Sequence, residues 1–269
     1  MERKRNLMSI IYRSFASVLI LLLITMVGSA KSTINSEHLS DNLPSTYKSK
    51  AYDAFINGDM GKWLNLIIEM ESDIVSLKGK PAENDVKMEL LNYYYGYTAF
   101  LISKEQMREA STYAEKGEKI IEMFLAKQPQ NAEMLAYKAA FKGFKIGISK
   151  FKAVTLGMQS QSIIKKAYAL SPGNIRVLTE RGNILFYSPK MFGGNKREAI
   201  QMYKKAASAL ESRGDTVGNW EYLNLLTIIA QALLDTGNKN EAINLYKKLL
   251  ILEPRFKWAQ EKLKIISDF

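Results

Sequence analysis

The sequence predicts an all-α fold, a right-handed superhelical solenoid of antiparallel helix pairs that ends in a C-terminal capping helix. One observation is a twelve-residue stretch that occurs twice, at 194–205 and 237–248, with nine identical positions and an offset of 43 residues. Recurrence at such a period is typical of stacked helix pairs. The other is that apolar residues recur every three or four positions between turns rich in Gly, Pro and Asn, which indicates amphipathic helices. We expect about five helix pairs and the cap within residues 44–269.

Both copies of the repeated stretch are predicted to start a helix. Asn195 and Asn238 stand at the N-cap position, and Glu198 and Glu241 follow three residues later. This spacing is that of a capping box, in which the two side chains satisfy backbone N–H groups reciprocally. The helix of the second copy is expected to stop at Pro254, because proline lacks the N–H group that a continuing helix needs.

Around the second copy, small, apolar and aromatic residues follow a fixed order along two consecutive helices. They are Leu226, Ile229, Ala230, Leu233, Ala242, Tyr246 and the closing Pro254. This order resembles the tetratricopeptide repeat (TPR) family, and the resemblance implies that first helices line a concave surface where a protein or peptide partner binds. Asn224, Thr227 and Gln231 fall where that family presents groove-facing side chains, so they are candidate partner-binding residues.

The start of the chain predicts a targeting segment. Four basic residues accompany an apolar run at 15–27, and small residues end it at Ala30, which is typical of a signal peptide cleaved after Ala30. The run is shorter than the roughly 20 residues of a spanning helix, although an uncleaved anchor remains the alternative. No cysteine follows, so a lipoprotein anchor is excluded. We expect residues 1–30 to be removed, 31–43 to be a flexible leader, and the protein to be periplasmic or secreted in a bacterium, without stable membrane insertion.

The residue types needed for most catalytic chemistry are scarce. The chain has no cysteine, and its one histidine, His38, lies in the predicted leader. Disulfides, cysteine nucleophiles and thiolate metal sites are therefore excluded. No phosphate-binding glycine loop, His-Glu-x-x-His helix or nucleophile elbow is present. We expect no enzyme activity, cofactor or metal; a carboxylate-based glycan-active enzyme is the least favoured alternative.

The net charge is strongly positive. The formal charge is +11, and removal of four basic residues and one acidic residue with 1–30 leaves +8. Basic surfaces attract nucleic acids, anionic lipids or acidic polymers. Because no nucleic-acid motif accompanies the charge, and acids are interleaved with it over most helices, we expect a solvated exterior and no nucleic-acid partner.

The predicted helix at 132–152 carries a stripe of lysines. Lys138, Lys142, Lys145 and Lys152 share one arc at 100° per residue,. On a concave face they would form a basic groove for an acidic peptide or a carboxylate. A solvated outer face is the alternative. Pro129 and Pro172, which flank this helix pair, are 43 residues apart, which is longer than one repeat of the family. The sequence therefore does not determine whether the lysines face the concave or the outer side.

A run of tyrosines marks a second candidate surface. Tyr93, Tyr94 and Tyr95 are consecutive, and Tyr97 follows. Neighbours on a helix point about 100° apart, so the three cannot all face one core. We therefore predict that Tyr93 and Tyr97 belong to a ligand-contacting surface, with aromatic packing between helices as the alternative.

The segment 188–194 interrupts the repeat before its first copy. Met191 and Phe192 are its apolar residues, and they are candidate partner contacts because inserted loops in repeat arrays often lie on a binding rim. Alternatively, Phe192 fills a local gap between helices. Pro-x-x-Phe-Gly-Gly before a Glu-Ala helix is similar to loops in exported TRAP transporter T-component proteins. This second resemblance implies an accessory subunit of a solute-uptake system that binds a small ligand or forms a pore by oligomerisation.

The function predicted first is an exported, non-catalytic adaptor that binds a protein or peptide through its concave surface. A basic groove at the lysine stripe would favour an acidic partner. Whether the protein forms a homo-oligomer stays open at this level.

Overall fold

The computed structural model describes residues 47–149, 151 and 153–267. The predicted signal peptide, the predicted leader and the predicted site residue Lys152 lie outside the described residues. None of the helices within the described part is both long and apolar enough to cross a membrane.

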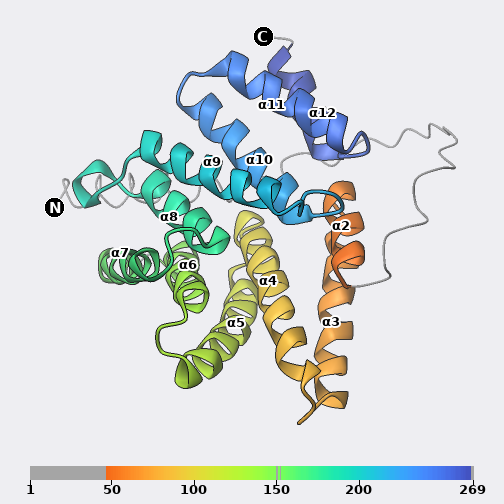
Figure 1. Cartoon of the computed structure of the whole chain (residues 1–269), viewed down its shortest axis with the longest axis vertical. Helices are drawn as coiled ribbons and strands as arrows, with labels where there is room; N and C mark the ends of the chain where they lie inside the picture. The colour runs from red at the N-terminus through yellow and green to blue at the C-terminus, as the bar shows by residue number, and fades with distance from the viewer. Residues whose placement is uncertain (1–46, 150, 152, 268–269) are drawn as a thin grey trace, which may run out of the picture.

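Five antiparallel helix pairs and a final helix make up the described part of the chain, so the predicted all-α solenoid with a capping helix is confirmed (Figure 1). Each pair packs against the next along the chain. A short 3₁₀ helix, η2, lies within the predicted insertion. The helices are α2 (Tyr47–Asn57) and α3 (Met60–Ser76); α4 (Ala82–Ser103) and α5 (Met107–Lys127); α6 (Ala132–Ile148) and α7 (Ala153–Leu170); α8 (Ile175–Tyr187), η2 (Lys190–Phe192) and α9 (Lys196–Ser212); α10 (Trp220–Asp235) and α11 (Lys239–Leu252); and α12 (Lys257–Ser267).

Asparagine side chains cap several of the helices. Asn195 accepts a hydrogen bond from the backbone N–H of Glu198 at 3.2 Å, as predicted. The reciprocal half of the box is absent, because the Glu198 carboxylate pairs with Arg181 on α8 at 2.9 Å. Asn131, Asn174 and Asn219 cap α6, α8 and α10 in the same way.

The capping prediction is wrong at the second copy. Asn238 makes no side-chain cap to α11, and its amide instead donates to the Thr236 hydroxyl at 3.0 Å. Glu241 pairs with Lys204 of α9 at 2.5 Å. The two copies therefore differ at the asparagine, because Asn238 bonds within its own turn, whereas both glutamates pair with a neighbouring helix.

Small residues set how closely the helices approach. Gly182 of α8 faces Tyr203 of α9, and a Cβ atom added to the glycine would lie 2.4 Å from the tyrosine ring. Gly117 of α5 faces Phe141 of α6 at the same distance. In both places a fully buried aromatic ring occupies the space that a side chain would need, so glycine is required for the observed packing.

The N-terminal pair also contacts the C-terminal end of the array. α2 packs against α10 and α12 (Figure 1). The Phe55 ring lies 5.7 Å from Trp220 and 5.2 Å from Phe256, centroid to centroid. The Tyr52 hydroxyl donates to Glu253 Oε2 at 3.0 Å, across 201 residues. The array thus closes on itself, which the local repeat pattern did not predict.

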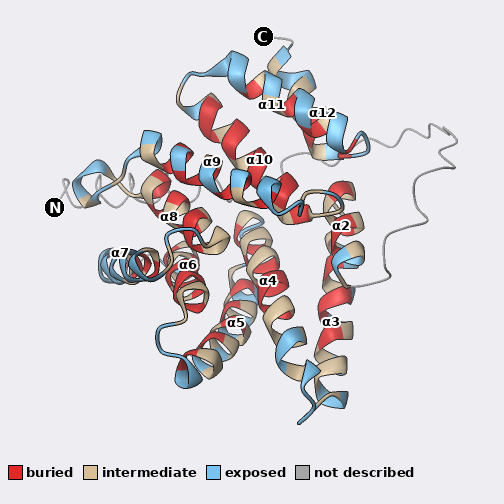
Figure 2. Ribbon diagram, viewed as in Figure 1, coloured by how far each residue is buried: buried red, intermediate tan, exposed pale blue. Residues whose placement is uncertain are grey.

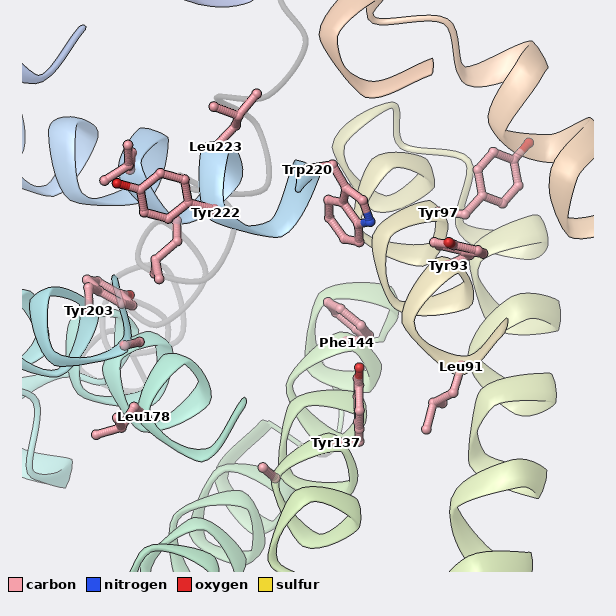
Figure 3. Packing of buried hydrophobic residues seen from close by; sticks show 14 of the residues in the cluster. Leu91, Tyr93, Tyr97, Tyr137, Phe144, Leu178, Tyr203, Trp220, Tyr222 and Leu223 are labelled. Carbon is pink, nitrogen blue, oxygen red and sulfur yellow. The ribbon is translucent and has the colours of Figure 1, made fainter. Parts of the chain in front are cut away.

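Aromatic side chains fill the space that this closure encloses. Trp63 of α3 and Trp220 of α10 meet edge to face at 5.0 Å, and Tyr93 of α4 packs against both rings. Figure 3 shows Tyr93 and Trp220 in this core. The buried residues follow the facing sides of the helices, as Figure 2 shows. Part of the interior expected as an open concave groove is therefore core.

Candidate functional site

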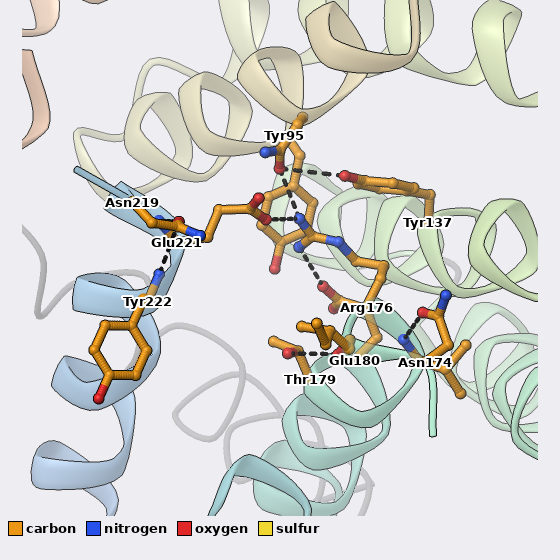
Figure 4. A network of polar contacts seen from close by, with 12 residues as sticks. Tyr95, Tyr137, Asn174, Arg176, Thr179, Glu180, Asn219, Glu221 and Tyr222 are labelled. Atoms are coloured by element: carbon orange, nitrogen blue, oxygen red, sulfur yellow. Dashed lines mark hydrogen bonds and ion pairs between the residues drawn. The ribbon is translucent and has the colours of Figure 1, made fainter. Parts of the chain in front are cut away.

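Polar side chains from four first helices converge in the interior of the array (Figure 4). They come from α4, α6, α8 and α10, which are the helices expected to line a concave face. We call this group the central polar cluster. Its members are Asn92, Tyr95, Tyr137, Arg176, Glu180, Asn183 and Glu221.

Arg176 is the centre of the cluster. Its guanidinium lies 5.0 Å from the Tyr95 ring centroid and 4.5 Å from the Tyr137 ring centroid. The side chain is only 10% exposed. A guanidinium between two ring faces gains cation–π attraction, which strengthens when water is excluded. The rings therefore hold the cation in one position between α4 and α6.

Three acceptors satisfy the Arg176 guanidinium. It donates to Asn92 Oδ1 at 2.7 Å and to Glu180 Oε1 at 3.3 Å, and it also pairs with Glu221. Burial by itself would lower the pKa of Arg176. The combined effect of the neighbouring Tyr137, Glu221, Glu180 and Tyr95 side chains is larger and raises the pKa well above its usual value. Arg176 therefore stays charged and links α8 to α4 and α10.

Glu180 is the buried acid of the cluster, with 2% of its side chain exposed. Burial raises its pKa, against the opposing effects of Arg176 and of hydrogen bonds from Asn183 and Tyr95. Asn183 donates to Glu180 Oε2 at 2.9 Å and in turn accepts from the Tyr203 hydroxyl at 2.9 Å. The network thus extends from the cluster into the α8–α9 packing.

The arrangement is suited to fixing helices, because its members satisfy one another. Glu221 is more exposed than Arg176: 40% of its side chain is accessible, so solvent reaches the cluster at this carboxylate. Within the described ranges, no group of three or more His, Cys, Asp or Glu side chains could hold a metal ion. The cluster therefore offers a rigid polar wall with one accessible carboxylate.

The predicted tyrosine surface is largely buried. Tyr93 is 1% exposed and Tyr97 is 7% exposed. The Tyr97 ring stacks on the Phe100 ring with the centroids 5.9 Å apart, and it meets the Tyr113 ring edge to face with the centroids 4.8 Å apart. These contacts are the aromatic packing that the sequence allowed as the alternative.

Different helices surround α4, so Tyr93 and Tyr94 are buried and Tyr95 is half-buried. Tyr93 points towards α3, Tyr94 towards α5 and Tyr95 towards α6. The 100° separation predicted from the sequence is correct, but each direction meets a packed neighbour. The ring partners are Trp63, Tyr113 and Tyr137, at centroid distances of 5.5, 5.9 and 6.0 Å.

The lysine stripe of α6 runs beside α5. Lys138 pairs with Glu122 at 2.8 Å, and Lys145 pairs with Glu118 at 2.6 Å. Lys142 lies between them on the helix and is half-buried. Two of these three cations are thus paired with a neighbouring helix, which reduces the charge available to an acidic partner.

The predicted groove positions on α10 differ in exposure. Asn224 and Gln231 are half-buried, and the Gln231 amide donates to Asp235 at 2.8 Å. Thr227 is 4% exposed and its hydroxyl has no hydrogen-bond partner among the described residues. Thr227 therefore offers no surface to a partner in this conformation, whereas Asn224 and Gln231 do.

The insertion is fastened to α7. Phe192 packs against the small buried cluster of Ile146 and Ala153, and the Gln161 amide donates to the Phe192 carbonyl. Phe192 thus fills a local gap, as the alternative interpretation allowed. Met191 beside it is 67% exposed, so the two predicted contact residues differ in access.

The sequence did not identify the central polar cluster. The available signal was Arg176 and Glu180, an oppositely charged pair four residues apart on a first helix. Their other partners lie far along the chain: Asn92 is 84 residues from Arg176, and Glu221 is 45 residues from it. Nothing in the local pattern shows that these segments meet.

Comparison with protein-family models finds no match, and comparison with curated protein sequences finds none either. Among solved structures, the chain is similar to a thermophilic TPR protein of Thermus thermophilus, with a TM-score of 0.52 and 14% identity, over 78% of this chain and 93% of that one. A tetratricopeptide repeat protein of Parabacteroides merdae matches with 12% identity over 82% of this chain and 98% of that one, but its TM-score of 0.30 carries no structural argument.

Proposed function

From the TPR-like fold, which is typical of protein-interaction scaffolds, we propose that this chain is an exported, non-catalytic scaffold that binds a protein or peptide segment. The predicted signal peptide supports export to the periplasm or beyond. The fold supports binding because a stack of helix pairs presents a long, rigid surface to an extended partner.

The binding surface in this proposal is the accessible part of α10 beside Glu221. Asn224 and Gln231 stand where the resemblance predicts groove-facing side chains, and both are half-buried. Glu221 is 40% exposed. The accessibility of these three polar side chains on one helix supports the proposal. Amide and carboxylate groups on a rigid helix can hydrogen-bond the backbone of an extended peptide, because they offer both donors and acceptors.

Photo-crosslinking tests the proposal directly. A photoreactive amino acid at Gln231 is expected to capture a partner in envelope extracts, whereas one at Lys205, which lies exposed on α9, is the control. The variant Asn224→Arg/Gln231→Arg is expected to lose at least about tenfold of the partner recovery, since new long charged side chains would block the surface.

A second variant separates the α10 surface from the lysine stripe. Lys142→Glu/Lys145→Glu is expected to leave partner recovery unchanged. If this variant alone lost the partner, the basic stripe would be the binding surface. Equal recovery by wild type and both variants would overturn both locations.

The solute-uptake alternative stays a prediction that rests on the resemblance of the insertion. A small organic acid retained by the purified protein, detected by native mass spectrometry, would favour that function over a scaffold.

A further inference from the structure

Apolar side chains protrude around the start of α7 and from η2. Phe151, just before α7, is 96% exposed, Val154 44%, Met158 57% and Met191 67%. We call these four residues the α7 edge. Val154 and Met158 lie four residues apart on α7, the spacing at which a helix presents side chains along one side, and Phe151 precedes the helix by two residues.

The insertion carries Met191 on η2, next to Phe192. Phe192 packs against the small buried cluster of Ile146 and Ala153, and Ala153 is the first residue of α7. The Gln161 amide also donates to the Ser188 hydroxyl at 3.2 Å. These contacts hold η2 against the same end of α7 from which Val154 projects. The apolar side chains are therefore displayed on a fixed base.

The surrounding sequence is almost free of acidic residues. Residues 134–197 contain twelve Lys and Arg but a single acid, Glu180, which is 2% exposed. On α7, Lys165 and Lys166 are exposed about two turns beyond Met158, and Lys190 is exposed beside Met191. The protruding apolar groups thus belong to a segment of the chain that is rich in cations and poor in acids.

We propose that the α7 edge is a peripheral contact site for an anionic lipid bilayer. A bilayer interface accepts protruding apolar side chains without a complementary pocket, while its negative surface attracts nearby Lys and Arg. The predicted targeting segment supports this occupant, because it would bring the chain to a membrane whether it is cleaved or retained. Contact of this kind requires no membrane-spanning helix.

Vesicle binding tests the proposal with the chain 31–269. Within the part of the chain that the structure describes, the buried residues of the main core lie between 51 and 259, so the chain 31–269 keeps them while lacking the apolar run that could bind lipid by itself. Circular dichroism with a cooperative unfolding transition verifies its fold. Co-sedimentation with phosphatidylglycerol–phosphatidylcholine vesicles at about 0.1 M salt is expected to exceed co-sedimentation with phosphatidylcholine alone by about tenfold, and to fall at about 0.5 M salt.

Substitutions distinguish the edge from general stickiness. Phe151→Ser/Met158→Ser is expected to reduce partitioning to anionic vesicles by about tenfold or more. Val217→Ser/Ile251→Ser is the matched control, because these side chains are 87% and 80% exposed elsewhere. It is expected to bind like wild type. Equal losses in both variants would overturn the assignment to the α7 edge.

The absence of native cysteine allows a direct readout of contact. An environment-sensitive fluorophore on Met158→Cys is expected to shift to shorter wavelength with anionic vesicles, and the same fluorophore on Val217→Cys is not. Failure of wild type to bind anionic vesicles would overturn the proposal. Loss of a protein partner, without any vesicle binding, in Phe151→Ser/Met158→Ser would reassign the edge to protein docking.

Discussion

The central polar cluster and the α7 edge belong to neighbouring helices, yet their side chains have opposite surroundings. In the cluster, Arg176 is 10% exposed and contacts two rings and three acceptors. At the edge, Phe151 is 96% exposed. Residue type alone therefore does not identify a binding surface. A charged residue can be structural when its partners are built in, and an apolar one can be available when nothing covers it.

Removal of the cation is expected to give the largest effect. Arg176→Met leaves Glu180 buried without its counter-charge, and we expect a loss of about 3–5 kcal/mol in the free energy of unfolding. Urea denaturation measures it. Arg176→Met/Glu180→Gln should recover part of the loss because the uncompensated charge is gone. The exposed Arg197→Met should change stability by less than about 0.5 kcal/mol; a similar loss there would contradict a special role for Arg176.

A substitution in the α8–α9 packing beside the cluster is expected to reduce stability nearly as much. Gly182→Ala places a Cβ 2.4 Å from the fully buried Tyr203 ring, and we expect a loss of about 1–3 kcal/mol from overpacking. Gly173→Ala is the control, since nothing lies within 4 Å of its added Cβ. Thermal unfolding that ranks the two variants equally would show that the α8–α9 contact tolerates separation.

The closing contact between α2 and the C-terminal end is expected to have an intermediate effect that depends on pH. Burial would raise the pKa of Glu253, but hydrogen bonds from Arg255 and Tyr52 outweigh it and the pKa is lowered. Stability from a lowered carboxyl pKa is present above the unfolded value of about 4.3 and is lost as the pH falls through the folded value.

Tyr52→Phe should therefore cost about 1 kcal/mol at pH 7 and less below about pH 4. Denaturation curves at both pH values measure this difference. Glu253→Gln should flatten the acid dependence of wild type. An unchanged acid dependence in Glu253→Gln would show that this contact does not contribute to it.

The smallest expected effect on stability is at the α7 edge. Phe151→Ser/Met158→Ser should change the free energy of unfolding by less than about 0.5 kcal/mol, because exposed side chains lose little burial. Urea denaturation at pH 7 checks this. A loss comparable with that of Arg176→Met would show that the edge packs against the fold, and would remove the contrast between the two regions.

The repeat pattern was sufficient to predict the five helix pairs and the cap, because helix periodicity and proline and asparagine turns act locally. It also offered the correct alternatives for Tyr93 and Phe192, as packing aromatics. It failed for Asn238, whose side chain makes no cap to α11 and whose amide donates to the Thr236 hydroxyl in the preceding turn. It also failed to identify Arg176 as a centre, because its partners come from segments 45 and 84 residues away.

By itself, the sequence determined the helix-pair architecture, the scarcity of catalytic residue types and the acid-poor stretch around α7, since each depends on composition or short-range spacing. Only the tertiary structure decided that α2 closes on α10 and α12, that Thr227 is buried, and that Arg176 is enclosed while Phe151 is exposed. The physical reason is that burial and ion pairing depend on which distant helices pack together, and the energies of those contacts are set by the surroundings that packing creates.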